Sequence, residues 1–315
     1  MIEVSDLTKT YPGVTAVDRL TFKIEKGEIA GFLGPNGAGK STTMRILTCF
    51  IAPTSGSATV AGFDAVRQSM EVRRRVGYLP ENNPLYTEMR VEEYLGYRAQ
   101  VKGVPRADRS KRVDEVLERV SLTERRRSII QHLSKGLRQR VGLADAIVHN
   151  PEIVILDEPT IGLDPTQVRD VRELILQLGK EHTVLLSSHI LSEVEKVCGR
   201  VLIINRGRLV EQGTPEEIAT RVMRTSRVRL EIRGDGRAIK EVLDRTPGVD
   251  HVIWAAKGDH NTFVIKARDD RDLRPELFKC CTAHAWDVYE LGYERQSLED
   301  LFRVLTEAGP AEAAS

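Results

Sequence analysis

Hydrophobic positions follow two patterns along the first two thirds of the chain. Short, mostly apolar runs of strand length occur at 28–33, 76–79, 153–156 and 183–187. Stretches with apolar residues at helical spacing lie among them, at 42–49, 90–120, 133–148 and 167–178. Shorter β-like pieces are predicted at 2–4, 20–24 and 57–61, with a closing hairpin at 201–205 and 207–211. Strands that alternate with helices predict an α/β fold.

The helical stretch at 90–120 is interrupted by Gly103-Val104-Pro105, because glycine followed by proline ends a helix. It predicts a mostly helical sub-domain, at about 86–150, inserted into the α/β domain. We place that whole domain at 1–221.

The pattern changes in the last third of the chain. Strands are predicted at 227–233, 249–255, 262–268 and 286–293, and helices at 238–246 and 273–285. The order β-α-β-β-α-β predicts a small ferredoxin-like α+β domain, at 222–307. Ser297-Leu298-Glu299-Asp300 has the form of a capping box and predicts a last helix. Residues 308–315 are small and polar and are predicted to be disordered. This domain shows no catalytic cluster, so we expect a small structural appendage.

Composition narrows the classes of partner. The 315 residues carry 47 Lys and Arg against 46 Asp and Glu, a formal charge of +1, which gives no electrostatic reason to expect nucleic acid. No apolar run approaches the roughly 20 residues of a membrane-spanning helix, so if the protein acts at a membrane, another chain must cross the bilayer. The four cysteines show no CxxC spacing, and reduced thiols in a cytosolic protein fit them best.

One stretch matches the phosphate-loop pattern G-x-x-x-x-G-K-[ST] at every fixed position. Its residues are Gly34, Pro35, Asn36, Gly37, Ala38, Gly39, Lys40, Ser41 and Thr42. The glycines let backbone N–H groups turn toward phosphate oxygens, and the following helix adds its positive end. Lys40 adds a full charge, and Ser41 offers Mg²⁺ a hydroxyl oxygen. A chance glycine-rich turn is the alternative, but the strand before and the helix after favour a nucleotide-binding site.

A second signal stands where the apolar run 153–156 ends in Asp157-Glu158. The strand delivers both carboxylates to its carboxyl end, which is where ligands bind in open α/β sheets. Asp157 could hold Mg²⁺ through water, and Glu158 could accept a proton from an attacking water. A solvated strand end is the alternative, which the complete phosphate loop disfavours.

Three weaker signals have ordinary explanations when taken alone. Tyr11, in the turn Thr10-Tyr11-Pro12-Gly13, could stack on adenine, but a surface tyrosine is commoner. Ser134 and Gly136 could bind an anion at a helix N-terminus, although a plain N-cap is commoner. His189, just past a central strand, could reach a γ-phosphate, although most lone histidines are structural.

Together and in this order, the motifs resemble the ATP-binding subunit of an ABC transporter. The resemblance covers residues 1 to about 221. It identifies 34–42 as the Walker A loop, Asp157 and Glu158 as the end of the Walker B strand, and His189 as the switch histidine. The fold it implies is a phosphate-loop ATPase with antiparallel β and helical sub-domains.

The same resemblance assigns the other motifs. Tyr11 takes the position of the adenine-stacking aromatic and Glu81 that of the Q-loop, where it would help to hold Mg²⁺. Residues 133–140 form the signature, and Gly162-Leu163-Asp164-Pro165 forms the D-loop, with Asp164 at the nucleotide site.

Two departures from the family pattern stand out. Glu81 replaces the usual Q-loop glutamine. In the signature, Lys135 and Leu137 depart from the consensus, whereas Ser134 and Gly136 match it. Both departures resemble the pattern of a sub-family of exporter ATPases that includes gliding-motility, drug and polysaccharide exporters.

The resemblance implies a mechanism. Two ATPase subunits, identical or different, would face each other head to tail, with each ATP between one Walker A loop and the other chain's signature. Closure and opening would drive transmembrane permease subunits, with the protein cytoplasmic and peripheral on the inner face of the cell membrane. Glu158 would act as base, and His189 would hold water and γ-phosphate.

Three other functions are open to a chain with these motifs. A soluble ABC ATPase acting on nucleic acid or ribosomes usually carries a coiled-coil insertion or two cassettes, which this chain lacks. An importer ATPase is disfavoured by the Q-loop and signature departures. A degenerate cassette that binds ATP without hydrolysing it is disfavoured by Glu158 and His189.

Overall fold

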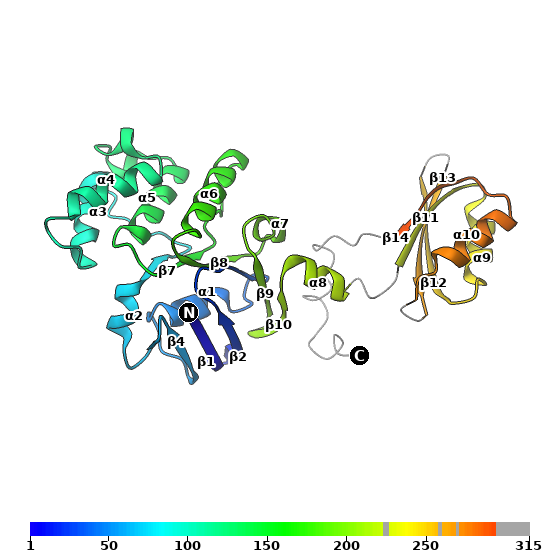
Figure 1. The fold of residues 1–315 in the computed structure, drawn as a ribbon, viewed down its shortest axis with the longest axis horizontal. Helices are drawn as coiled ribbons and strands as arrows, with labels where there is room; N and C mark the ends of the chain where they lie inside the picture. Colours follow the sequence, from blue (N-terminus) through cyan, green and yellow to red (C-terminus); the bar gives the residue numbers. More distant parts are fainter. Residues whose placement is uncertain (223–226, 258–259, 269–270, 294–315) are drawn as a thin grey trace. The chain divides into compact units, whose positions relative to one another are not determined.

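The computed structural model describes residues 1–222, 227–257, 260–268 and 271–293. The chain forms two compact units, one of residues 1–215 and one that begins at Glu216 (Figure 1). Helix α8 (Pro215–Val222) begins where the first unit ends.

A six-stranded sheet, in the order β10-β9-β3-β8-β7-β6, forms the centre of the first unit. Its parallel strands are β3 (Ile29–Leu33), β6 (Val76–Leu79), β7 (Ile153–Asp157), β8 (Thr183–Ser188) and β9 (Arg200–Asn205). Strand β10 (Arg208–Gly213) pairs antiparallel with β9, which confirms the predicted hairpin. The helices that follow strands here are α1 (Lys40–Leu47), α6 (Pro165–Leu178) and α7 (Leu191–Val194). The α/β prediction is confirmed, although α7 is too short for a periodic pattern to predict.

A smaller antiparallel sheet, in the order β2-β1-β4-β5, belongs to the same unit. Its strands are β1 (Ile2–Tyr11), β2 (Val14–Ile24), β4 (Ser55–Val60) and β5 (Phe63–Asp64). The sequence predicts much shorter first strands, because register shifts between Val4 and Leu7 interrupt their alternation. The prediction that Tyr11 lies in the turn is wrong: Tyr11 pairs with Val14 as the last residue of β1.

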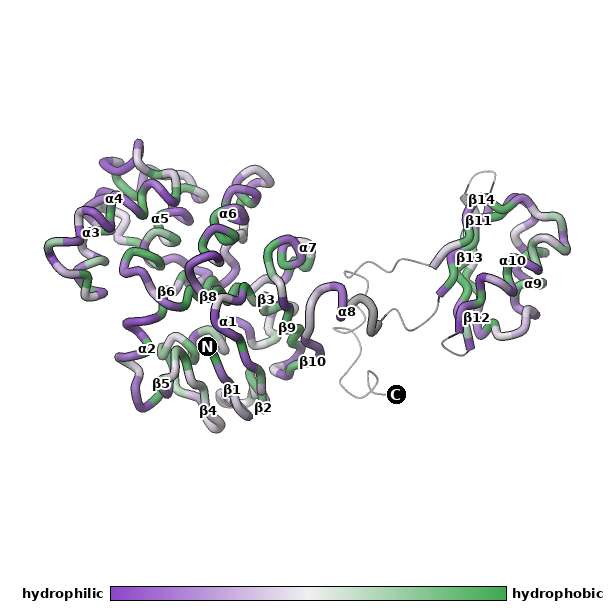
Figure 2. Tube along the Cα trace, in the orientation of Figure 1, coloured by the Kyte–Doolittle hydropathy of each residue, from purple (hydrophilic) through white to green (hydrophobic). Residues whose placement is uncertain are grey.

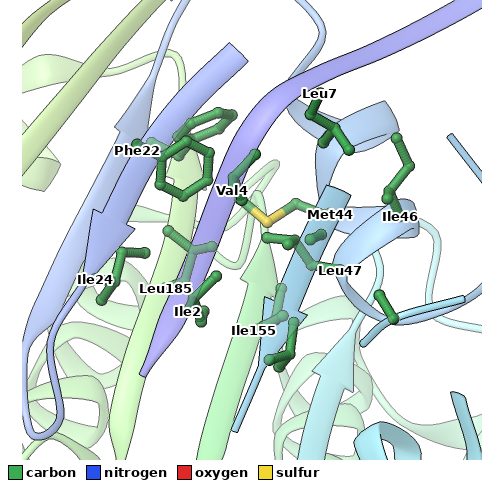
Figure 3. Packing of buried hydrophobic residues seen from close by; sticks show 14 of the residues in the cluster. Ile2, Val4, Leu7, Phe22, Ile24, Met44, Ile46, Leu47, Ile155 and Leu185 are labelled. Carbon is green, nitrogen blue, oxygen red and sulfur yellow. The ribbon is translucent and has the colours of Figure 1, made fainter. Parts of the chain in front are cut away.

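Helix α1 joins both sheets in one hydrophobic core (Figure 3). The core side chains labelled there come from β1, β2, α1, β7 and β8; they are Ile2, Val4, Leu7, Phe22, Ile24, Met44, Ile46, Leu47, Ile155 and Leu185. The phosphate loop therefore leads into a helix that is fixed on two sides.

The helical sub-domain consists of α3 (Val91–Val101), α4 (Arg109–Arg119) and α5 (Lys135–Ile147), after the short α2 (Ser69–Arg75). The predicted break is confirmed, with Gly103 at φ +83 between α3 and α4. Asp145 of α5 binds α3: its carboxylate accepts hydrogen bonds from Tyr94 (3.2 Å) and Arg98 (2.8 Å). Figure 2 shows hydrophilic residues on α2 and α4, in contrast to the hydrophobic central strands.

The second unit is an antiparallel sheet, in the order β12-β13-β11-β14, with two helices. Its elements are β11 (Arg227–Arg233), α9 (Gly236–Asp244), β12 (Val249–Lys257), β13 (His260–Ala267), α10 (Arg274–Ala283) and β14 (Val288–Tyr293). The predicted element order is confirmed, and the ferredoxin-like assignment stays a prediction. The predicted last helix from Ser297 and the tail at 308–315 lie outside the described residues.

Candidate functional site

The phosphate loop connects β3 to α1 along a path that only glycine can follow at two points. Gly39, at φ +103, is the N-cap of α1. A Cβ atom there would lie 2.4 Å from the carbonyl oxygen of Ala16 in β2, and one on Gly34 would lie 2.5 Å from that of Ile204 in β9. The loop is thus enclosed by backbone on two sides.

Lys40 opens α1 and turns its side chain back into its own loop. Its Nζ donates to the carbonyl oxygens of Gly34 (2.7 Å) and Pro35 (3.3 Å). The same ammonium lies 3.2 Å from Glu158 Oε1, and both side chains are buried. No hydrogen bond to that oxygen forms among the described residues, so the pair interacts through charge. A buried ammonium at a helix N-terminus suits an anion with several oxygens.

Asp157, the last residue of β7, accepts two hydroxyl hydrogen bonds at one oxygen. Ser187 Oγ donates to Asp157 Oδ1 at 2.6 Å, and Ser41 Oγ donates to the same atom at 3.3 Å. Strand β7 thus delivers a carboxylate directly to the start of α1. This pair of hard oxygen groups, from Ser41 and Asp157, is of the kind that Mg²⁺ prefers.

Glu158 follows in a left-handed conformation, at φ +49. Such a backbone costs a non-glycine residue on the order of 1 kcal/mol. The turn directs the carboxylate toward His189, whose Nδ1 lies 2.9 Å from Glu158 Oε2. His189 is 37 % exposed, whereas Glu158 is almost enclosed. A carboxylate between an ammonium and an accessible imidazole can take up a proton from a bound water.

Burial controls the electrostatics of this edge of the sheet. It raises the pKa of the Asp157 carboxyl, and the charge of Glu158 raises it further, against the hydroxyl hydrogen bonds of Ser187 and Ser41. Burial also raises the pKa of Tyr78, in β6, to about 12, and the charges of Asp157 and Glu81 add to this effect. Glu81 itself is exposed, just past β6.

The signature residues contact the D-loop and α6 of the same chain. Ser134 is the N-cap of α5, and its Oγ accepts a hydrogen bond from the backbone N–H of Leu137 at 3.4 Å. Gly136 packs so closely on Gln167 that a Cβ would lie 2.4 Å from that side chain. The Lys135 amine lies against Gly162 in the same way.

The structure brings together five of the predicted residues, namely Lys40, Ser41, Asp157, Glu158 and His189. It does not bring the signature to them: within the described residues, no hydrogen bond joins Ser134 or Gly136 to the phosphate loop. Asp164 caps α6, with its Oδ1 accepting from Thr166 and Gln167 N–H at 3.0 Å. Tyr11 is 39 % exposed, and the Lys9 amine lies 5.3 Å from its ring centre.

Sequence reasoning missed residues that support this site. Ser187 contacts Asp157, and Gln139 donates from α5 to the carbonyl oxygen of Pro159 at 2.9 Å. The sequence signal for the first is a serine pair, Ser187-Ser188, that closes an otherwise apolar strand. Gln139 lies within the predicted signature at 133–140, but the sequence gives no signal for its contact with Pro159.

Comparisons with known proteins identify the family of the chain. A family model described as "ABC transporter" matches residues 17–161. The chain is 33% identical over 311 residues to the bacitracin transport ATP-binding protein BcrA of Bacillus licheniformis, covering 98% of each chain. It is 32% identical over 310 residues to the linearmycin resistance ATP-binding protein LnrL of Bacillus subtilis, covering 97% of this chain and 98% of that one.

Solved structures match about two thirds of the chain. The ATP-binding subunit of an ABC transporter shares 32% identity with a TM-score of 0.65, covering 70% of this chain and 93% of that one. A dimeric ATP-binding cassette in a post-hydrolysis state, bound to ADP and Pi, shares 25% identity with a TM-score of 0.63. The match covers 68% of this chain and 98% of that one.

The phosphate loop, the paired carboxylates and the sheet that carries them define an ATP-binding cassette that hydrolyses ATP. The chain belongs to the ATP-binding proteins of ABC transporters. Across the residues that the structure describes, no helix has both the length and the apolar character to cross a membrane.

Proposed function

We propose that this protein is the ATP-hydrolysing subunit of an exporter that moves an antibiotic-like compound through separate membrane-spanning subunits. The observation that carries this proposal is the length of the similarity. The alignments to a bacitracin transport and a linearmycin resistance ATP-binding protein span both units, rather than the cassette alone. The protein would then lie in the cytoplasm, on the inner face of the membrane.

The residues at the sheet edge support specific roles. Lys40 would bind the β- and γ-phosphates, and the loop residues 34–42 would surround them. Ser41 and Asp157 would hold Mg²⁺, with Glu81 as a third oxygen donor; the bound ion would neutralise phosphate charge. Glu158 would orient and deprotonate the attacking water, and His189 would contact the γ-phosphate.

Two copies, or this chain and a related one, would complete each site. Ser134 and Gly136 lie on the same chain as the phosphate loop but form no hydrogen bond with it. A dimeric relative supports an arrangement in which they reach the nucleotide of a second subunit. Tyr11 would stack on adenine, and Asp164 would lie at the nucleotide site.

A capture experiment tests the transport proposal. Tagged Glu158→Gln protein would be purified from detergent-solubilised host membranes with ATP present, so that the closed dimer accumulates. We expect a multi-spanning membrane protein in stoichiometric amount. Lys40→Ala, treated identically, is the control that should not form the ATP-dependent dimer. Recovery of ribosomal or DNA-bound proteins instead would contradict the proposal.

The direction of transport needs a second measurement. Cells that express the chain with its captured partner should accumulate less labelled bacitracin than cells that express Glu158→Gln with the same partner. Higher accumulation would favour an importer, and equal accumulation would mean that bacitracin-like compounds are not the substrate.

A further inference from the structure

Ser187 is a fully buried polar residue at the end of β8. In the sheet register it lies beside Asp157 of β7 on one side and Phe32 of β3 on the other. Side chains alternate along a strand, so Ser187 shares a face with Leu185, as Asp157 does with Ile155. That face packs on α1, because Leu185 and Ile155 belong to the core that contains α1.

The hydroxyl of Ser187 makes two hydrogen bonds, one to each of the two acidic residues. It donates to Asp157 Oδ1 at 2.6 Å and accepts from the backbone N–H of Glu158 at 2.9 Å. A hydroxyl has a single proton to donate, so these two contacts fix its rotation. One buried side chain thereby ties together the carboxylate of Asp157 and the backbone of Glu158.

The first contact determines which oxygen of Asp157 is free. Ser187 and Ser41 both donate to Oδ1, and Oδ2 accepts no side-chain hydrogen bond from the described residues. Hydrogen bonds to a charged group are stronger than neutral ones, so the donor in the sheet should hold the carboxylate in one rotamer. Oδ2 is then the oxygen presented to a cation or its water.

The second contact supports a strained turn. Glu158 adopts φ +49, which an unsupported glutamate would avoid. Acceptance of its N–H by Ser187 satisfies a donor that the left-handed turn removes from the regular strand ladder. This turn also places the Glu158 carboxylate beside His189 and Lys40.

We propose that Ser187 is a positioning residue for hydrolysis: it aims the Asp157 carboxylate at the Mg²⁺ position and holds the turn that presents Glu158. The inference rests on the proposed Mg²⁺-dependent mechanism. It assigns a function to a residue that acts through Asp157 and Glu158 without touching the nucleotide.

Equilibrium binding of mant-ATP tests the first half of the proposal. The gain in affinity on adding Mg²⁺, relative to EDTA, would be compared between Ser187→Ala and the unsubstituted chain, both carrying Glu158→Gln so that nucleotide is not consumed. We expect the substitution to reduce this gain by about 10-fold, because one hydrogen bond to a carboxylate is lost. Affinity in EDTA should stay within about 2-fold, because Lys40 and the loop are unchanged.

Two variants separate positioning from general damage. Ser187→Thr keeps the hydroxyl and should restore the Mg²⁺ gain. Ser188→Ala removes the neighbouring buried hydroxyl, which hydrogen-bonds to the backbone of Ile190 and to no other described residue, and should leave the gain unchanged. Thermal unfolding of each variant would verify that the first unit is folded. In the Glu158-containing chain, Ser187→Ala should lower kcat about 10-fold or more with a smaller change in the KM for ATP.

A Ser187→Ala protein that is folded and keeps the full Mg²⁺ gain and kcat would overturn the inference. An equal loss in Ser188→Ala would also overturn it, because the effect would then come from disturbed packing. If the unsubstituted chain shows no Mg²⁺ gain and no hydrolysis, the proposed function itself fails, which is a different result from either of these.

Discussion

The two units of this chain differ in what they bury. The first buries charged groups at one edge of its sheet, where Lys40, Asp157 and Glu158 are each less than a tenth exposed. In the described part of the second unit, the buried polar residues are Thr246 and Asn261, which carry no charge. Burying a charge is costly unless it is paired, and buried ionisable groups that cluster at one sheet edge are typical of a functional site.

The neutral groups of the second unit are used for packing. Asn261 accepts a hydrogen bond from Trp254 Nε1 and donates to the carbonyl oxygen of Gly234, both at 2.8 Å. Around it lies an apolar core that includes Leu230, Phe263 and Ile265. The difference indicates that the second unit can be altered without direct damage to the ATP chemistry of the first.

The largest expected effect comes from removing the largest buried side chain in the hydrophobic core of the second unit. Phe263 is fully buried, and Phe263→Ala should destabilise the second unit by about 3 to 5 kcal/mol, because it leaves a cavity. Both tryptophans of the chain, Trp254 and Trp286, lie in this unit, so their fluorescence follows its unfolding alone. ATP affinity of the first unit should be unchanged.

The matched control for this cavity is Val264→Ala, on the opposite face of the same strand, where the side chain is half-buried. We expect Val264→Ala to lower the free energy of unfolding of the second unit by less than about 1 kcal/mol, because the two methyl groups of Val264 bury little surface. If Phe263→Ala abolishes ATP binding as well, the two units unfold as one and the separation is wrong.

The second test changes the chemistry of the first unit. Glu158→Gln should lower kcat at least about 100-fold, because an amide cannot accept the proton of the attacking water. ATP binding should persist, since the loop and Lys40 remain. The tryptophan transition of the second unit should not move. Near-normal turnover would exclude Glu158 as the base.

Much of the first unit could be predicted because its signals are local. The phosphate loop is a contiguous stretch of sequence, and the strand that ends in Asp157 and Glu158 places both carboxylates by itself. The bulged strands β1 and β2 could not be predicted at full length, because the register shifts break the alternation on which strand prediction depends.

The contacts that organise the site are not local. Ser187 lies beside Asp157 only because β7 and β8 pair in that register, and no spacing rule supplies a register between strands so far apart in sequence. The same holds for Lys40 and Glu158, and for Asp145, which joins α5 to α3. Residue types indicated the chemistry of the site, whereas the sheet determined which residues meet.

A pH titration should separate the units by the groups each one buries. Burial, with the charge of Lys102, lowers the pKa of His149 in the first unit to about 3. In the unfolded chain this histidine takes up a proton near pH 6.5, whereas in the folded chain it stays neutral. The free energy of unfolding of the first unit should therefore be highest above about pH 6.5 and should fall below it, by up to about 1.4 kcal/mol per pH unit. His149→Gln should flatten this dependence.

The second unit should respond only at lower pH. The hydrogen bond from Arg274 lowers the pKa of Asp272 to about 2, so its contribution is present above the unfolded value near 4 and is lost as the pH falls toward 2. Calorimetry together with tryptophan fluorescence would follow both units. A first unit that keeps constant stability between pH 6.5 and 5 would show that His149 is not buried in neutral form.

The smallest expected effect compares two helix caps that differ only in their surroundings. Asp164 caps α6, and Asp235 caps α9 by accepting hydrogen bonds from Arg237 and Ala238 N–H at 3.0 and 3.4 Å. Either Asp→Ala change should cost about 1 kcal/mol of stability in its own unit, because two helical N–H groups lose their acceptor.

Only the first of these caps should matter for turnover. Asp164 lies in the D-loop, so Asp164→Ala should lower ATPase activity several-fold, whereas Asp235→Ala should leave kcat/KM within about 2-fold. Asn variants retain the cap and would show whether the charge of Asp164, rather than the helix end, is required. Equal turnover in the two Ala variants would show that Asp164 acts only as a helix cap. The D-loop would then not be a functional difference between the two units.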